Sequence, residues 1–311
     1  MEALLTEAFI GSLLFGAVTA GIPLLLAGLG EQISEKAGVL NIGLEGMMLV
    51  GAYAGFSVTY LSGSFELGFL AGAFAGLGIG VLMGILCVWF QLNQIVVGIA
   101  ITLGAEGVTA LLHHFQFSRS YPRLGKSEAL TIPFLSDLPY FGEALFSRYW
   151  LVYAAVALVF VLVWVFRRSI VGLNLQAAGD NPAALDAAGV SVSATRFAAV
   201  SVTGALGGLG GAYMSTIGGG IFLPFMTGGA GFIAIVLAML ARGNPTWVLG
   251  GALLFGSSLS MTTALQVAGV NVPTDIIQML PFALVMIVLV VFARHSYLPP
   301  ALAIPYYRGE R

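Results

Sequence analysis

Two acidic residues, Glu45 and Glu106, lie inside otherwise apolar stretches that are long enough to cross a membrane. A charged side chain at the centre of a bilayer costs about 2.5–3.5 kcal/mol on insertion scales, so such residues face protein or water. A carboxyl group in that setting can relay protons, line a path for a hydrophilic solute, or hydrogen-bond the end of a neighbouring helix. The sequence leaves all three interpretations open for both residues.

Patterns that would support catalysis are missing from the sequence. His113 and His114 are adjacent at the end of an apolar run, so they lack the spacing of a zinc site and we interpret them as interfacial. Gly125-Lys126-Ser127 matches only the end of a phosphate loop, because Ser120 stands where the first glycine is needed. No Gly-x-Ser-x-Gly elbow is present, and the single cysteine, Cys87, cannot form an intrachain disulfide. We therefore expect no catalytic residue, no metal site and no cofactor.

A polar stretch between two apolar runs carries the most informative pattern. Asn181 suits the N-cap of a helix, Pro182 its first position, and Gly189 the left-handed turn after its end. The intervening residues would form a helix of about 10 Å, which is too short to cross a membrane. This helix is either an incidental surface turn or a rigid tip that docks onto a cytoplasmic partner.

Composition places the chain in a membrane. Of its 311 residues, 59% are hydrophobic and only 8% are charged, and the mean hydropathy is +0.98. Soluble domains carry roughly 25% charged residues. A soluble enzyme is therefore excluded, and the net charge of −2 excludes a large basic surface for nucleic acid. We expect the all-α class: a polytopic transmembrane helical bundle, surrounded by membrane lipid, with about 8–10 spans.

The apolar runs define the expected spans. The uncharged run 67–105 would be roughly 58 Å long as one helix, so it must fold back at the polar residues 91–94. Residues 31–36 are expected to be a polar connector, and the glycines and the single proline of 222–241 predict either a crossing or a half-helix. The spans are predicted at residues 8–29, 39–61, 67–90, 95–114, 149–166, 197–241 (one or two), 246–265 and 276–293.

Glycine recurs every four residues along one expected span. The repeat comprises Gly68, Gly72, Gly76, Gly80 and Gly84. On a helix this spacing forms a smooth ridge that a neighbouring backbone can approach closely. The ridge is either a subunit or gate interface, or ordinary helix packing within the chain.

Two polar stretches and the basic residues predict how the bundle is oriented. We expect one transmembrane domain over residues 1–311, with an external loop at about 116–147 and a cytoplasmic loop at about 169–195. Because cytoplasmic segments carry the excess of Lys and Arg, nine crossings would leave the N-terminus external and the C-terminus cytoplasmic. The inner basic residues would be Lys36, Arg167, Arg168, Arg196, Arg242, Arg294, Arg308 and Arg311, against Arg119, Arg123, Lys126 and Arg148 outside.

Four stretches together resemble one transporter family, the branched-chain amino acid, ribose and nucleoside permeases of ABC importers. The family's coupling loop is similar to Gly179-Asp180-Asn181-Pro182-Ala183-Ala184-x-x-Ala187-Ala188-Gly189-Val190. Residues 31–46, EQISEKAGVLNIGLEG, resemble the opening signature of the nucleoside and simple-sugar branch. Residues 241–251 and the tail 305–311 are similar to its later cytoplasmic loop and C-terminus. The likeness covers residues 20–311 in the same order.

The resemblance implies a non-catalytic subunit that forms half of a solute pathway in a bacterial cytoplasmic (inner) membrane. Its partners would be a second, usually different permease, a separate ATPase, often with two fused nucleotide-binding domains, and an external solute-binding protein or lipoprotein that delivers a small-molecule substrate. No nucleic-acid partner is expected. The implied ATPase-coupling residues are Gly179, Asp180, Asn181, Pro182, Ala183, Ala184, Asp186, Ala187 and Gly189.

The leading interpretation is an ATP-driven importer subunit for nucleosides, with a simple sugar such as ribose as the alternative. Asn41, Glu45 and Glu106 are the candidate polar lining of the path. Phe222 and Phe225 either stack on a base or lie at the membrane interface. A proton-coupled secondary carrier is a further alternative, but a carrier has no use for a helix that docks onto an ATPase.

Overall fold

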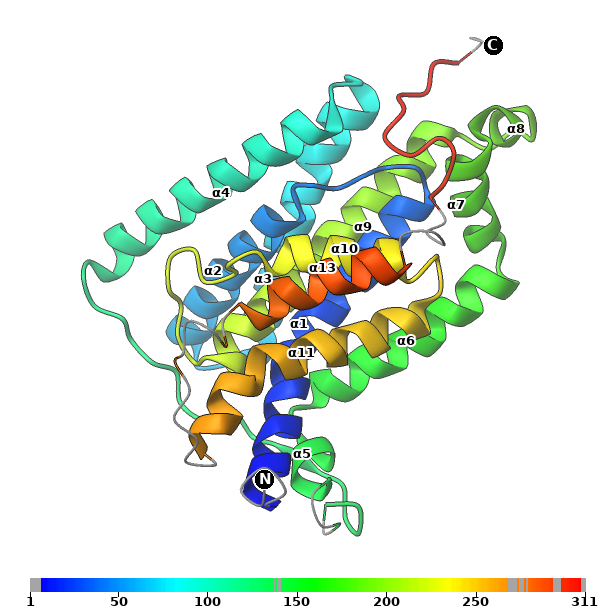
Figure 1. Cartoon of the computed structure of the whole chain (residues 1–311). Helices are drawn as coiled ribbons and strands as arrows, with labels where there is room; N and C mark the ends of the chain where they lie inside the picture. The colour runs from blue at the N-terminus through cyan, green and yellow to red at the C-terminus, as the bar shows by residue number, and fades with distance from the viewer. Residues whose placement is uncertain are drawn as a thin grey trace.

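The computed structural model describes residues 7–136, 138, 141–267, 273, 277, 279–292 and 298–308, and it is a bundle of helices (Figure 1). The long helices are α1 (Glu7–Lys36), α2 (Leu44–Ser62), α3 (Phe65–Gly84), α4 (Gln94–Phe117), α6 (Trp150–Arg168), α9 (Val192–Tyr213) and α11 (Pro245–Val267). The shorter helices are α5 (Gly142–Phe146), α7 (Ile170–Asp180), α8 (Pro182–Ala187), α10 (Ala230–Leu240) and α13 (Leu280–Phe292). Single π-helical turns extend α3 over Ile85–Trp89 and α9 over Met214–Gly218.

Six of the described helices are long and apolar enough to cross a membrane. Among the described residues, strands are limited to the antiparallel pair β1 (Leu130–Thr131) and β2 (Ser147–Arg148), which lies in the loop between α4 and α6. The predicted all-α, polytopic bundle is therefore confirmed. Part of the last expected span, together with Arg294 and Arg311, lies outside the described residues.

Helix α1 runs through the middle of the bundle and packs against α11, α9 and α10 (Figure 1). Its residues Leu24, Leu25 and Leu26 are each 1% exposed. Helices α1 and α11 approach so closely that a Cβ at Gly256 would overlap the backbone of α1 at Ala17 and Gly21. The tight centre of the molecule is thus built on small residues, as expected where lipid removes the hydrophobic drive for helix association.

The glycine ridge on α3 packs against α9 within the same chain. A Cβ at Gly76 would overlap the backbone of Gly204 and Gly208, and one at Gly80 would press on Val200 and Gly204. Glycines on both helices therefore let two backbones touch. Of the two interpretations of the repeat, internal packing is the one that the structure forms.

The expected polar connector at residues 31–36 is wrong, because α1 continues without a break to Lys36. Glu31 and Glu35 are 0% and 5% exposed, and a Glu31 carboxylate oxygen accepts the backbone N–H of Asn41 at 3.0 Å. Because protein covers these polar side chains, the helix does not have to end where they begin. The chain reverses only after Lys36, at Gly38, whose φ of +86° suits glycine.

The ambiguous segment 222–241 forms a half-helix rather than a crossing. Helix α10 has 11 residues, or about 16 Å, roughly half the thickness of the hydrocarbon core. It starts after Gly229, which has a φ of +90°. Non-helical backbone at such depth is tolerated where protein buries it or where it lines a cavity.

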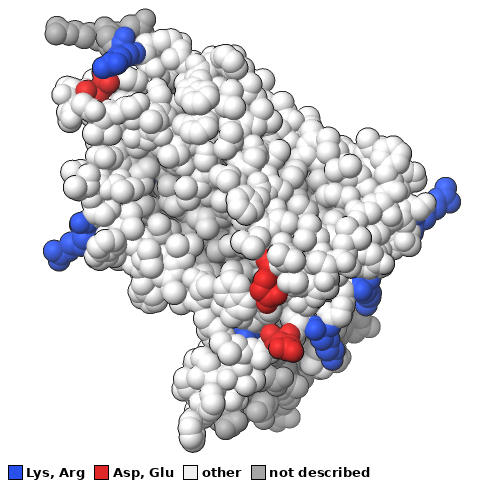
Figure 2. Space-filling view, turned by 180° about the vertical axis from the view of Figure 1, so that it is seen from behind, with Lys and Arg blue, Asp and Glu red and all other residues white. Residues whose placement is uncertain are grey.

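Much of the surface seen in Figure 2 is uncharged. On this face most Lys and Arg side chains lie along the outline, acidic groups lie inside the lower half, and the broad area above these acidic groups carries no charge. The helix α4 stands at one side of the bundle (Figure 1) and exposes Val96, Leu103 and Phe115 at 63–76%. These surfaces suit contact with lipid.

Candidate functional site

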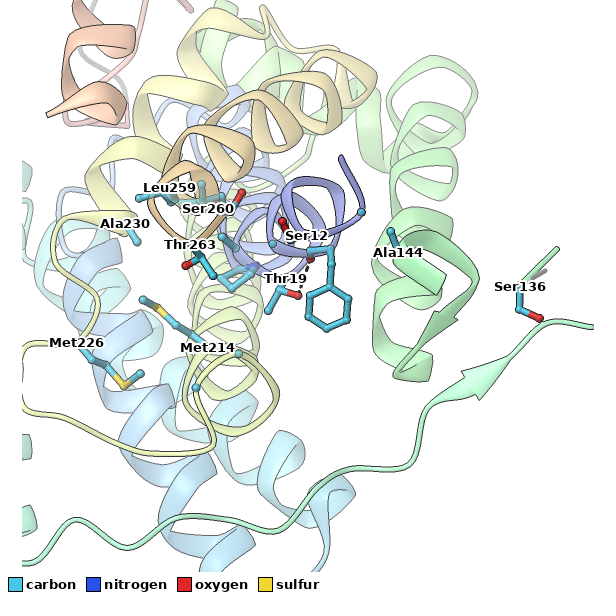
Figure 3. A pocket seen from close by; sticks show the side chains of 18 of the residues that line it. Ser12, Thr19, Ser136, Ala144, Met214, Met226, Ala230, Leu259, Ser260 and Thr263 are labelled. Atoms are coloured by element: carbon cyan, nitrogen blue, oxygen red, sulfur yellow. Dashed lines mark hydrogen bonds between the residues drawn. The ribbon is translucent and has the colours of Figure 1, made fainter. Parts of the chain in front are cut away.

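A cavity of about 1340 Å³ lies in the half of the bundle where α1 begins (Figure 3). Small-molecule pockets commonly have volumes of about 300–1,000 Å³, so this one has room for a solute and water. Ser12, Thr19, Ser260 and Thr263 of α1 and α11 lie around the space in Figure 3, with Met214 and Met226 at another wall. None of the described residues that line it is charged. The cavity therefore offers hydroxyl groups and apolar surface.

The buried Arg148 holds one wall of this cavity. Its guanidinium donates to the backbone oxygens of Ala144 at 2.6 Å and Phe15 at 2.7 Å, and to the Thr19 hydroxyl at 2.9 Å. All three of these residues line the cavity. The Arg148 guanidinium carbon also lies 3.7 Å from the centre of the Phe15 ring, which is 47% exposed. The cation thus fixes an aromatic ring at the cavity wall.

The Glu45 side chain caps the N-terminus of the half-helix α10, beside the same cavity. Its carboxylate oxygens accept the backbone N–H groups of Gly229 at 2.8 Å and Gly231 at 2.6 Å. These are orphan donors of a helix N-terminus, where negative charge is favoured. Ala230, the residue between them, lines the cavity. Because Glu45 already occupies this helix end, the end is not open to an anionic group of a solute.

The other expected path residues lie apart from the cavity lining. Asn41 is fully buried at the turn between α1 and α2, and its side-chain amide donates to the Met47 sulfur at 3.2 Å. Glu106 is half-buried on α4 beside the stripe that faces α2. The sequence therefore grouped three residues that the structure brings to three different places.

The two candidate stacking rings also differ in their surroundings. Phe222 is 0% exposed and packs among Tyr53, Phe56 and His113. Phe225 is 56% exposed on the loop before α10. Phe15 and Arg148, which do shape the cavity, were missed by the sequence reasoning. The available signal was the pair of hydroxyl residues Ser12 and Thr19, which lie seven residues apart and therefore on one face of α1.

At the opposite end of the bundle, the expected short helix is present as α8. The Asn181 side chain accepts the N–H of Ala184 at 3.1 Å, Pro182 is the first residue, and Gly189 follows with a φ of +83°. Leu185 is buried at 4% exposure and anchors the helix. The opposite face is exposed and small, and consists of Ala183, Ala184, Ala187 and Ala188. Such a face allows another protein to approach closely.

The predicted coupling residues of this segment lie in two environments. Gly179 is buried where α7 meets the turn after α1, and a Cβ there would overlap the Lys36 carbonyl oxygen. Asp180 ends α7, and Asp186 pairs with Arg308 at 3.3 Å. Packing thus requires glycine at position 179, whereas the alanines of α8 are exposed and packing within the chain does not require them to be small.

Comparison with known proteins agrees with this architecture. The family described as branched-chain amino acid transport system / permease component matches residues 13–289. A putative glucose ABC transporter permease, TsgC13 of Haloferax volcanii, is 39% identical over 80% of this chain and 76% of its own. The guanosine permease NupQ of Bacillus subtilis is 32% identical over 93% and 94%, and the nucleoside permease NupC of Lactococcus lactis is 30% identical over the same shares.

Proposed function

The chain belongs to the family of branched-chain amino acid transport system permease components, and from this membership we propose that it is the membrane subunit of an importer for nucleosides. It is a non-catalytic, multi-pass membrane permease of the ABC transporter type. Two relatives that match it over nearly their whole length are a guanosine permease and a nucleoside permease. The structural observation behind the proposal is the chemistry of the cavity.

The Phe15 ring, backed by the Arg148 guanidinium, is the observation that carries this proposal. A fixed aromatic face at the wall of a hydroxyl-lined cavity suits a flat, neutral ring that carries a sugar. An amino acid would bring a carboxylate, and the nearby helix end that could bind it is filled by Glu45. These contacts favour a nucleoside over a branched-chain amino acid.

The energy source would act at the opposite end of the molecule. We place α8 in the cytoplasm together with the C-terminus, where its small exposed face would enter a groove of a separate ATPase. A second permease would complete the pathway, and an external binding protein would deliver the solute to the end that holds the cavity. The charge pattern of the loops and the shape of α8 support this arrangement.

The direct test is uptake by the reconstituted transporter. Proteoliposomes that contain this permease, its second permease and the ATPase are supplied with ATP inside and with binding protein and radiolabelled guanosine outside. We expect ATP-dependent uptake, and Phe15→Ala is expected to lower it about tenfold while Phe15→Trp retains it. Phe74→Ala, at an exposed site on α3, is the matched control.

A simple sugar is the second candidate solute, because TsgC13, which is named a putative glucose permease, is 39% identical to this chain. Saturable uptake of glucose or ribose without guanosine uptake would replace the nucleoside proposal by this one. Uptake by this chain alone, driven by a proton gradient without ATP, would support the secondary carrier instead.

A further inference from the structure

The C-terminal segment 298–308, called the strap below, lies against α7 and α8 at one end of the molecule (Figure 1). Its backbone joins two other parts of the chain: Ala301 N–H donates to the Gly179 oxygen at 2.9 Å, and Ala303 N–H donates to the Gly38 oxygen at 3.1 Å. The Gln91 side chain donates to the Tyr306 oxygen at 3.0 Å. The strap is therefore hydrogen-bonded to the base of the coupling region rather than loosely attached to it.

Arg196 is the common anchor of the strap, α1, α7 and α9. This α9 side chain is 3% exposed and donates to four backbone oxygens: Ala37 at 3.1 Å, Ala178 at 3.1 Å, Ile304 at 2.7 Å and Ala301 at 3.4 Å. Ala37 and Ala178 lie at the C-terminal ends of α1 and α7, where unpaired carbonyls favour a cation. One guanidinium thus connects two helix ends with the strap.

The strap also touches α8 itself. Tyr306 packs with Leu185 of α8, Ala178 of α7 and Val192 of α9. The Arg308 guanidinium pairs with Asp186 of α8 at 3.3 Å, and the Arg308 side chain is 84% exposed. An exposed ion pair typically changes an equilibrium by about fivefold or less, so this pair orients α8 rather than holding it alone.

We propose that the strap and α8 form one rigid unit that receives the ATP-hydrolysing subunit, and that Arg196 passes the displacement of this unit to α1 and α9. This inference rests on the proposed docking of the ATPase on α8. The strap continues the exposed face of α8 with Ile304, Tyr307 and Arg308, which are 55%, 47% and 84% exposed. The docking surface is therefore larger than the six residues of α8.

Charge reversal in the complete transporter tests the link between the strap and α8. Asp186→Arg and Arg308→Asp are each expected to lower uptake per ATP hydrolysed by about two- to fivefold, because each places like charges side by side. The double variant restores the pair and is expected to recover most of the loss. Arg168→Asp, at the end of α6, is the control for a change of charge at this end. A double variant no better than the worse single variant overturns the link.

Cross-linking tests whether the two parts move together. Asp186→Cys and Arg308→Cys are introduced together and joined by a short bifunctional thiol reagent, with the native Cys87 buried. If the strap and α8 move as one rigid unit, the transporter keeps its ATP-dependent uptake after cross-linking. Loss of uptake on cross-linking, with recovery when a cleavable reagent is cut, means that the strap must separate from α8 and contradicts the proposal.

A variant of α8 separates this inference from the proposed function. Ala184→Arg lies on the exposed face and is expected to abolish co-purification of the ATPase. If Ala184→Arg has that effect and the strap variants change nothing, only the strap proposal fails. If the ATPase still co-purifies with Ala184→Arg, the assignment of α8 as the helix that docks onto the ATPase fails. The strap proposal, which rests on that assignment, then fails too.

Discussion

The Glu45 carboxylate of α2 accepts the backbone N–H of Gly231 at the start of α10, at 2.6 Å. A Cβ at Gly231 would collide with the backbone of Glu45, so the two residues are in contact through main chain as well as hydrogen bond. A buried carboxylate therefore serves as the cap of a half-helix that begins beside the cavity. The sequence leaves three roles open for Glu45. Its contacts support one of them, hydrogen bonding to the end of a neighbouring helix.

Glu45→Ala is expected to lower the free energy of unfolding by about 1.5–3 kcal/mol, because two backbone donors lose a charged acceptor. Glu106→Ala is the matched control at a half-buried position of α4, where we expect a change within about 0.5 kcal/mol. Thermal unfolding of both variants in the same detergent checks this. Equal melting temperatures would show that the Glu45 cap contributes nothing.

Gly208→Ala is expected to destabilise the bundle by about 1–3 kcal/mol, since the new Cβ would overlap the Gly72 oxygen on α3 and the backbones must move apart. Gly104→Ala places the same methyl group on α4, where no atom beyond its own helical turn and chain neighbours lies within 4 Å. That control is expected to be neutral or to stabilise by up to about 1 kcal/mol through helix propensity. Yield and thermal stability measured side by side distinguish them, and a similar loss in both would argue against tight α3–α9 packing.

Arg148→Gln is expected to lower solute uptake at least about tenfold, because the Phe15 ring and the Thr19 hydroxyl lose the group that fixes them. Arg148→Lys keeps the charge but not the forked geometry, so only partial recovery is expected. The measurement is ATP-dependent guanosine uptake, normalised to the amount of assembled transporter. Full activity of Arg148→Gln would show that this wall of the cavity does not take part in solute transport.

Tyr149→Phe is expected to cost about 1 kcal/mol, because the Tyr149 hydroxyl donates to a Glu66 carboxylate oxygen at 2.8 Å. Burial, followed by the hydrogen bond to Glu66, raises the pKa of the Tyr149 phenol to about 12. The unfolded value is about 10, so the stabilisation is complete below pH 10 and lost as the pH rises through about 12. The cost of the variant, measured by denaturant unfolding, is therefore expected to be constant between pH 6 and 9.

Local features of the sequence determined much of the architecture. Uninterrupted apolar runs require spanning helices in lipid, and the polar residues 91–94 mark the reversal between α3 and α4, where Asn93 caps α4. The caps at Asn181, Pro182 and Gly189 likewise act within one turn, so the sequence alone predicted α8. The order of the four matching stretches was sufficient to identify the family.

Only the tertiary structure decided what the buried polar groups do, since their partners are distant in the sequence. Glu45 bonds to Gly231, 186 residues away, and Arg196 bonds to Ala37, 159 residues away. Hydropathy alone treats such a charge as a break in a helix or as a functional site. It therefore predicts a connector at Glu31 and Glu35, where α1 in fact continues. The energetic cost of burying each charge is met by backbone groups that only the folded bundle brings within reach.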